Sequence, residues 1–143
     1  MSFLLDTNVV SEWTHPRPNP HVVRWLFETE EDTLFLSVIT FAEIRQGIEE
    51  LPSGRRRDSL KNWLEDELTS RFEPRILPVD LPVAHAWGVF MARSTAVGAN
   101  LGAVEALFAA TAQAHELTLV TRNSRHFNRL GIPLLNPWTS PAC

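Results

Sequence analysis

The sequence predicts an α/β protein, a three-layer α/β/α sandwich around a mainly parallel sheet. Short apolar runs alternate along the chain with longer segments whose apolar residues recur at helical spacing. The clearest run, residues 117–121, has the continuous hydrophobicity of a strand buried on both faces, which is typical of parallel sheets. The chain has 143 residues, of which 44% are hydrophobic, so it is long enough to bury its own core. We expect a single domain over residues 1–143.

The first third of the chain is predicted to alternate strands and helices. A strand over residues 3–5 ends at an acid, and a short helix follows because Asp6-Thr7-Asn8 offers N-cap side chains. Three prolines then break the chain before a helix over residues 21–31, and the apolar run 33–38 forms the second strand. Thr40 and the acid three residues later have the spacing of a capping box, which predicts a helix over 40–51.

The remaining elements continue this alternation. Pro52-Ser53-Gly54 separates the previous helix from the next one, and leucines at spacings of three and four predict that next helix. Prolines and glycines mark the later boundaries. The expected elements are a helix over 56–72, a strand over 76–79, a helix over 82–96, a loop over 98–102, a helix over 104–115, strands over 117–121 and 134–135, and a tail marked by Pro137 and Pro141.

Composition and charge exclude several classes of protein. The formal net charge is −4, so the chain has no general basic surface for nucleic acid. Acids gather in residues 1–50 and bases beyond them, which fits either a carboxylate site beside a basic rim or ordinary surface patterning. The single cysteine, Cys143, excludes a disulfide framework and a cysteine-rich zinc site. No apolar run reaches the roughly 18 residues of a membrane span, so we expect a cytoplasmic chain without a membrane partner.

Three acids lie beside apolar or small residues at the ends of predicted elements: Asp6, Glu43 and Glu105. Each has a structural alternative, since Asp6 is also a candidate N-cap, Glu43 a capping-box partner and Glu105 a first-turn acid favoured by the helix dipole. The strand and helix ends that carry them are predicted to meet at one sheet edge, where buried carboxylates without partners are costly. A hard divalent cation, Mg²⁺ or Mn²⁺, would offset that cost and could activate water against a phosphodiester.

The chain resembles a PIN-domain protein of the VapC type, the toxin of a bacterial toxin–antitoxin pair. The resemblance rests on three segments: residues 4–12 (LLDTNVVSE), residues 37–47 with FAEIRQG, and residues 107–123. The closing residues 134–138 (LLNPW) are similar to the FitB-like branch of the family. The combination spans nearly the whole chain.

The resemblance implies a PIN-like fold, metal-dependent cleavage of RNA by water, a homodimer, and a cognate VapB-like antitoxin that blocks the site. The implied substrate is a structured RNA such as tRNA or rRNA, and operator DNA would be bound only through the antitoxin. By position, Asp6 and Glu43 match the first two acids of the family. Glu105 falls where the family usually has Asp, and Asn123 falls at the fourth ligand position. These four residues are therefore the expected catalytic and metal-binding set.

Two further groups of residues are expected near this site. The first would position water and the ligands, and consists of Thr7, Asn8 and Thr121. The second could contact RNA phosphates, and consists of Arg122, His126, Arg55 and Arg56. For the arginines the structural alternatives are an ion pair of Arg122 with an acid and a solvated helix face at residues 55–57.

Two other functions fit parts of the sequence. A weakly active or inactive PIN module would act mainly by binding its antitoxin and regulating operator DNA, and Glu105 and Asn123 motivate this alternative. A phosphatase of the haloacid dehalogenase type also places an Asp after its first strand. That enzyme needs a second acid two residues later, where this chain has Asn8.

Overall fold

A computed structural model describes residues 1–98 and 100–139 of the chain. The tail that Pro141 is expected to mark, together with Cys143, lies outside the described residues. Within the described residues, no helix is long and apolar enough to cross a membrane.

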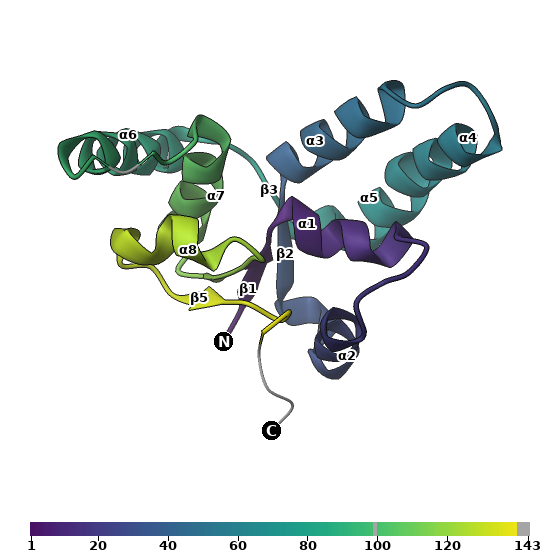
Figure 1. Ribbon diagram of the computed structural model, residues 1–143, viewed down its shortest axis with the longest axis horizontal. Helices are drawn as coiled ribbons and strands as arrows, with labels where there is room; N and C mark the ends of the chain where they lie inside the picture. Colours follow the sequence, from purple (N-terminus) through teal and green to yellow (C-terminus); the bar gives the residue numbers. More distant parts are fainter. Residues whose placement is uncertain (99, 140–143) are drawn as a thin grey trace.

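Strands and helices alternate through the described chain as the sequence predicts (Figure 1). The strands are β1 (Phe3–Leu5), β2 (Leu34–Ser37), β3 (Ile76–Leu77), β4 (Thr118–Val120) and β5 (Leu134–Leu135). The α-helices are α1 (Thr7–Val10), α2 (Pro20–Glu28), α3 (Val38–Glu49), α4 (Arg55–Asn62), α5 (Thr69–Phe72), α6 (Leu81–Ala96), α7 (Ala103–Ala114) and α8 (Ser124–Phe127). A π-helical segment, η3 (Trp63–Leu68), joins α4 to α5, and 3₁₀ turns are η1 (Ser11–Thr14), η2 (Glu31–Thr33), η4 (Glu73–Arg75) and η5 (Asn128–Leu130).

The five strands form one sheet in the order β3-β2-β1-β4-β5, and every neighbouring pair is parallel. β1 is therefore the central strand. Its pairing with β4 places Leu5 opposite Val120, so the two strands end at the same level. The residues that follow them, Asp6 and Thr121, are consequently neighbours at the carboxyl edge of the sheet.

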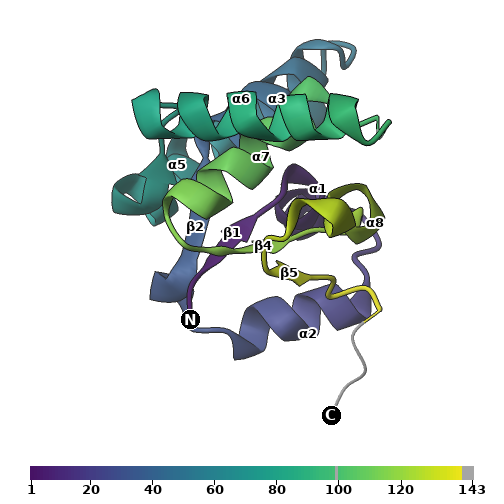
Figure 2. The same cartoon turned by 90° about the vertical axis from the view of Figure 1, so that its left-hand side faces the viewer.

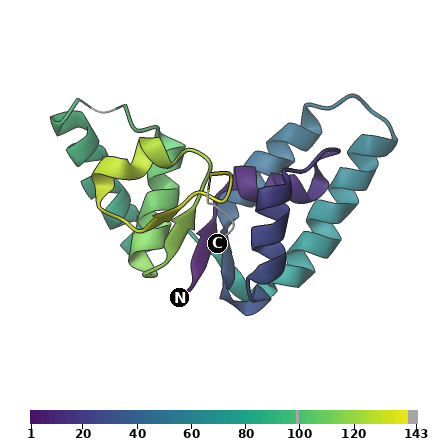
Figure 3. The ribbon, with the colours of Figure 1, turned by 60° about the horizontal axis from the view of Figure 1, so that its bottom comes forward.

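The sheet is covered by helices on both faces, as Figures 2 and 3 show. Successive strand residues point to opposite faces, so Leu4 packs with the core under α6, α7 and α8 while Leu5 packs with the core under α1 to α5. Leu119 and Val120 divide in the same way. The buried residues of the described chain are mainly apolar. The predicted three-layer α/β/α sandwich with a parallel sheet is confirmed.

Two local predictions were wrong. The N-cap of α3 lies three residues before the expected one, because the Ser37 hydroxyl accepts from the Ile39 N–H at 3.0 Å and so takes the capping role. Thr40 lies inside the helix and is fully buried, so it forms no capping box with Glu43. The short helix α8 was not predicted, since a single turn is too brief for apolar spacing to mark it.

Candidate functional site

Asp6 lies where the central strand ends and α1 begins. Its backbone N–H donates to the Val120 carbonyl at 2.9 Å, which ties it to the end of β4. One carboxylate oxygen accepts from the Thr7 N–H at 2.7 Å, so Asp6 is the N-cap of α1. The other accepts from the Thr121 hydroxyl at 2.7 Å. Asp6 thus caps α1 with one carboxylate oxygen and binds the residue after β4 with the other.

Glu43 reaches the same place from the first half of α3. Its carboxylate accepts a hydrogen bond from the Thr7 hydroxyl at 2.5 Å, and that hydroxyl also lies 3.1 Å from the hydroxyl of buried Thr40. Glu43 itself is exposed. The expected cost of removing a carboxylate from water therefore applies to Asp6, although hydrogen bonds offset part of it, whereas Glu43 lies at the exposed rim of the site.

Asn8 and the chain after β4 close one side of the site. The Asn8 amide donates to Asp6 Oδ2 at 3.4 Å, and its oxygen accepts from the Arg122 N–H at 3.5 Å. The Asn123 N–H donates to the Thr121 hydroxyl at 3.0 Å. Thr121, which is fully buried, therefore holds both the Asp6 carboxylate and the turn that carries Asn123.

Glu105 comes from the first turn of α7. One of its carboxylate oxygens accepts from the Gly102 N–H at 3.0 Å, which satisfies a free donor at the start of the helix. Its other oxygen contacts Nδ1 of His126. Glu105 does lie in the first turn of the helix, as its structural alternative expects, while its bond to the Gly102 N–H and its contact with His126 were not predicted.

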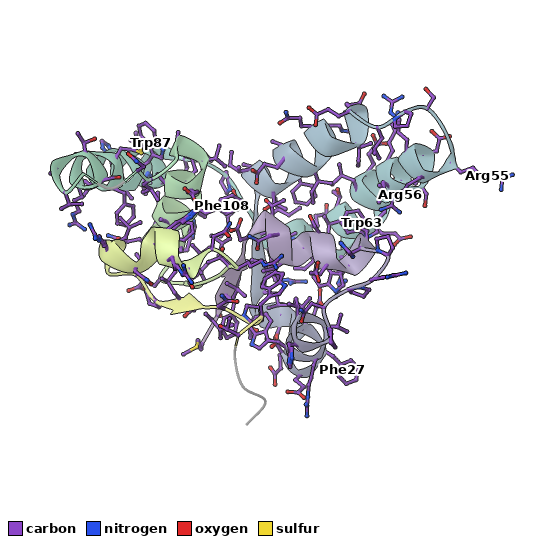
Figure 4. The ribbon with its side chains drawn as sticks, viewed as in Figure 1. Phe27, Arg55, Arg56, Trp63, Trp87 and Phe108 are labelled. Carbon is purple, nitrogen blue, oxygen red and sulfur yellow. The ribbon has the colours of Figure 1, made fainter. Side chains whose placement is uncertain are left out.

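These side chains share one cavity of about 360 Å³ at the carboxyl edge of the sheet, lined by Asp6, Thr7, Asn8, Ser11, Glu43, Val104, Glu105, Phe108 and Asn123. Figure 4 shows Phe108 between α7 and the centre of the molecule, where it forms part of the apolar wall. All four expected catalytic and metal-binding residues line this cavity. Thr7 and Asn8 line it as well, and Thr121 supports it from below.

Electrostatics at the site disfavour the charged form of Asp6. The pKa of its carboxyl is raised above the ordinary value of 3.8, chiefly because burial removes water from the carboxylate. The hydrogen bonds from Thr121 and Thr7 act in the opposite direction, while the negative charges of Glu43 and Glu105 raise the pKa further. The cavity therefore concentrates negative charge that a cation would neutralise.

The donor set suits a hard divalent cation, because carboxylate and amide oxygens are the ligands that Mg²⁺ and Mn²⁺ prefer. The side chains are not arranged as a finished coordination shell. Among residues 1–98 and 100–139, no three His, Cys, Asp or Glu side chains lie close enough together to hold a metal ion. Glu105 is directed toward Gly102 and His126, and Glu43 toward Thr7. A cation bound by all the acids would require side-chain rotation at Glu105 and Glu43.

The four predicted RNA-contacting residues lie in different places. His126 is at the cavity through Glu105, and the Arg122 guanidinium lies over the Trp138 ring at 5.4 Å from its centroid. In the described part of the chain Arg122 forms no ion pair with an acid. Arg56 lines a neighbouring groove that also includes Thr7 and Glu43. Arg55 extends away from the molecule at the beginning of α4 (Figure 4).

Sequence reasoning missed two polar residues of the site. Ser11 lines the cavity one helical turn after Thr7, and Thr40 supports Thr7 from one turn before Glu43. Their spacing of three and four residues from predicted site residues was the available signal, because such residues share a helix face.

The comparisons with known proteins agree with this architecture. The sequence matches the PIN domain family over residues 3–133, and the chain belongs to that family. It is 41% identical over 135 residues to the plasmid stability protein StbB of Pseudomonas syringae pv. tomato, covering 94% of this chain and 97% of the relative. It is 37% identical to the VapC ribonuclease Y4jK of Sinorhizobium fredii (94% and 96% covered) and 38% identical to the toxin FitB of Neisseria gonorrhoeae (94% and 97% covered).

A solved structure extends the likeness to three dimensions. The structure of FitAB bound to an IR36 DNA fragment contains a chain that is 36% identical to this one and superposes with a TM-score of 0.92. The match covers 97% of each chain. The fold and the order of its elements are therefore those of a PIN domain of the FitB and VapC type.

Proposed function

We propose that this chain is a metal-dependent endoribonuclease, the toxin of a VapBC-type toxin–antitoxin system. The observation that carries the proposal is the convergence of Asp6, Glu43, Glu105 and Asn123 on one cavity at the carboxyl edge of the sheet. Relatives named as a VapC ribonuclease and as the toxin FitB, similar over nearly their whole length, support the same function.

The residues proposed for this site have different roles. Asp6, Glu43, Glu105 and Asn123 would hold one or two Mg²⁺ or Mn²⁺ ions. Such a cation, when bound, lowers the pKa of water and stabilises negative charge on a phosphoryl group. Thr121 and Asn8 orient the Asp6 carboxylate, and Thr7 orients Glu43. Ser11 and Asn123 supply polar groups that can position a water or a phosphate oxygen in the same cavity.

The first test replaces Asp6→Asn and measures cleavage of a structured RNA by purified chain, free of any partner, in Mn²⁺. We expect cleavage to be lost while the circular dichroism spectrum is kept. The matched control is Asp32→Asn, since Asp32 is exposed in η2 and does not line the cavity. Full activity in the Asp6 variant would refute the assignment.

We further propose a homodimer, and a VapB-like antitoxin that blocks the acidic cavity with a basic segment and carries the operator-DNA contacts. The support for the antitoxin is the similar complex of FitAB bound to DNA, together with the negative charge of the cavity, which attracts a basic segment. Co-expression with the product of the adjacent gene, followed by affinity purification, tests this assembly. An antitoxin should co-purify and suppress cleavage, and a complex that cleaves RNA as fast as the free chain would contradict the proposal.

A second candidate function is a weakly active module that acts mainly by binding its antitoxin. The contacts of Glu105 with Gly102 and His126 favour this alternative, because they occupy both oxygens of a proposed ligand. On this view the purified chain given Mn²⁺ leaves structured RNA intact yet still binds the antitoxin. The same cleavage assay therefore separates the two functions.

A further inference from the structure

A second cavity in the described chain is larger than the acidic one. It measures about 620 Å³ and lies between the end of α6 with the loop after it and the segment formed by α8 and η5. Ser94 helps to fix its wall, because the Ser94 hydroxyl accepts from the Leu101 N–H at 3.1 Å and holds the loop against α6. The buried side chains of Leu101 and Leu130 form an apolar floor that belongs to the core.

The rim of this cavity is strongly basic. Arg93 contributes from α6, Arg125 from α8 and Arg129 from η5. All three are exposed, and in the described part of the chain none of them forms an ion pair with an acid. Three arginines without neutralising partners around one hollow make a local positive field in a chain whose net charge is −4.

The basic cavity adjoins the acidic one. His126 lines the basic cavity, and its ring contacts Glu105, which lines the acidic cavity. A polyanion is repelled by the acidic cavity, so an RNA strand needs cationic contacts close by in order to stay there. Arginine is suited to this role because its guanidinium binds phosphate through two parallel hydrogen bonds.

We propose that the cavity between α6 and α8 is a binding site for the RNA strand next to the cleaved bond, with phosphates held by Arg93, Arg125 and Arg129. The inference rests on the proposed nuclease function and adds the place where the substrate lies. Leu101 and Leu130 give the sugar and base of an unpaired nucleotide an apolar surface, and the volume is within the range of small-ligand sites.

RNA suits this cavity better than an acidic peptide does. The rim offers three separate arginines, one each from α6, α8 and η5, which suits a ligand with several separate negative charges such as a phosphodiester backbone. The contact of His126 with Glu105 also links this site to the cavity proposed to cut that backbone. Binding of an acidic partner segment at the same place is the competing outcome, and affinity for the antitoxin distinguishes it from RNA binding.

The test compares the triple variant Arg93→Gln/Arg125→Gln/Arg129→Gln with wild type. The matched control is Arg17→Gln/Arg24→Gln/Lys61→Gln, which removes the same charge from exposed positions outside the cavity. Binding to a fluorescent single-stranded RNA is measured by anisotropy over a salt series in EDTA, where no cleavage occurs. Cleavage of the same RNA is then measured separately in Mn²⁺.

We expect the cavity variant to bind about tenfold or more weakly at low salt, and the slope of log affinity against log salt to fall by about 2, since each phosphate contact on a single strand contributes roughly 0.7. Its KM should rise much more than its kcat falls, and the control should resemble wild type. Circular dichroism and gel filtration verify that both variants keep the fold and oligomeric state.

Three results would overturn the inference. If wild type cleaves RNA and the cavity variant binds it like the control, the site is wrong while the nuclease function stands. If the cavity variant loses affinity for the co-expressed antitoxin and keeps its affinity for RNA, the occupant is the partner protein. If wild type neither binds nor cleaves RNA, both the site and the proposed function fail.

Discussion

The surroundings of Asp6 disfavour the negative charge of its carboxylate. Its carboxylate is mostly removed from water, and two further acids line the same cavity, so its pKa is raised from the ordinary value of 3.8. The folded chain thus holds a proton at Asp6 more tightly than the unfolded chain does. Between pH 3.8 and the raised pKa, the unfolded chain has released the Asp6 proton while the folded chain still holds it. The free energy of unfolding therefore decreases as the pH rises through this range, and the decrease persists at higher pH.

Asp6→Asn is therefore expected to stabilise the metal-free chain at pH 8. The amide can still accept from the Thr7 N–H while it avoids the buried charge. The gain in melting temperature should shrink as pH falls toward 4, where the wild-type carboxyl becomes protonated. Thermal melts in EDTA at pH 8, 6 and 4 measure this effect. A variant that is less stable than wild type at pH 8 would show that the hydrogen bonds at Asp6 outweigh its desolvation.

Glu105 is divided between two roles, since its carboxylate caps α7 and contacts His126 while it also lines the acidic cavity. An Asp at this position is one methylene shorter, so it should give up the His126 contact. We expect Glu105→Asp to bind Mn²⁺ several-fold more tightly, as measured by calorimetry.

His126→Gln is the matched variant, because it weakens the same contact without changing the length of the acid. It should move the Mn²⁺ affinity in the same direction. Glu105→Gln, which removes the charge, should weaken binding. If Glu105→Asp weakens binding as much as Glu105→Gln does, the longer side chain is required and the contact with His126 does not compete with the metal.

The start of α3 decides where Glu43 points. Ser37 is buried and caps the helix through the Ile39 N–H, so Ser37→Ala leaves a donor without its partner. We expect a loss of about 1 kcal/mol, within the roughly 0.5–2 kcal/mol range of N-cap removals, measured by urea unfolding. Ser59→Ala, at an exposed position inside α4, is the control and should be neutral or slightly stabilising. Equal stability of Ser37→Ala and wild type would contradict the cap assignment.

The start of α3 illustrates which features of the fold the sequence predicts and which it does not. Apolar runs predicted every strand of the described chain, because strands buried on both faces are apolar throughout. Helical spacing and N-cap residues predicted six helices that cover seven of the eight described α-helices, since residues 56–72 were expected as one helix where the structure has α4, η3 and α5. The strand predictions also placed Asp6 at the correct sheet edge. The sequence did not identify Ser37 as the cap, because Ser37 and Thr40 are both N-cap residue types and the strand was expected to run past Ser37, whereas β2 ends there.

The contacts of the site that the sequence did not predict were missed for a related reason. Glu105 and His126 are 21 residues apart, and their contact depends on a one-turn helix that has no periodic signal. The basic cavity between α6 and α8 was not predicted either, because Arg93 and Arg129 are far apart in the sequence. They line one cavity only after the elements between them, including β4, have folded. Contacts between side chains of distant elements depend on how those elements pack, and one sequence does not specify that packing in advance.

The described chain has two apolar cores, one on each face of the sheet, and of their buried residues only Phe108 lines the acidic cavity. We therefore expect the fold to persist in EDTA. A cation that binds only the folded chain should raise its stability by about 2.7 kcal/mol at a hundred times its Kd. For a chain of this length, that corresponds to an increase in melting temperature of roughly 5–11 °C.

This stabilisation should depend on the acids and on pH in a defined direction. In Asp6→Asn/Glu43→Gln the increase caused by Mn²⁺ should largely vanish, and in wild type it should be smaller at pH 5 than at pH 7.5, because protons compete for the raised-pKa carboxyl of Asp6. Differential scanning calorimetry with and without Mn²⁺ measures both effects. Unfolding on addition of EDTA would mean that a metal supports the fold itself. An equal Mn²⁺ effect in wild type and the double variant would place the cation away from Asp6 and Glu43, and the nuclease assignment would then lose its physical basis.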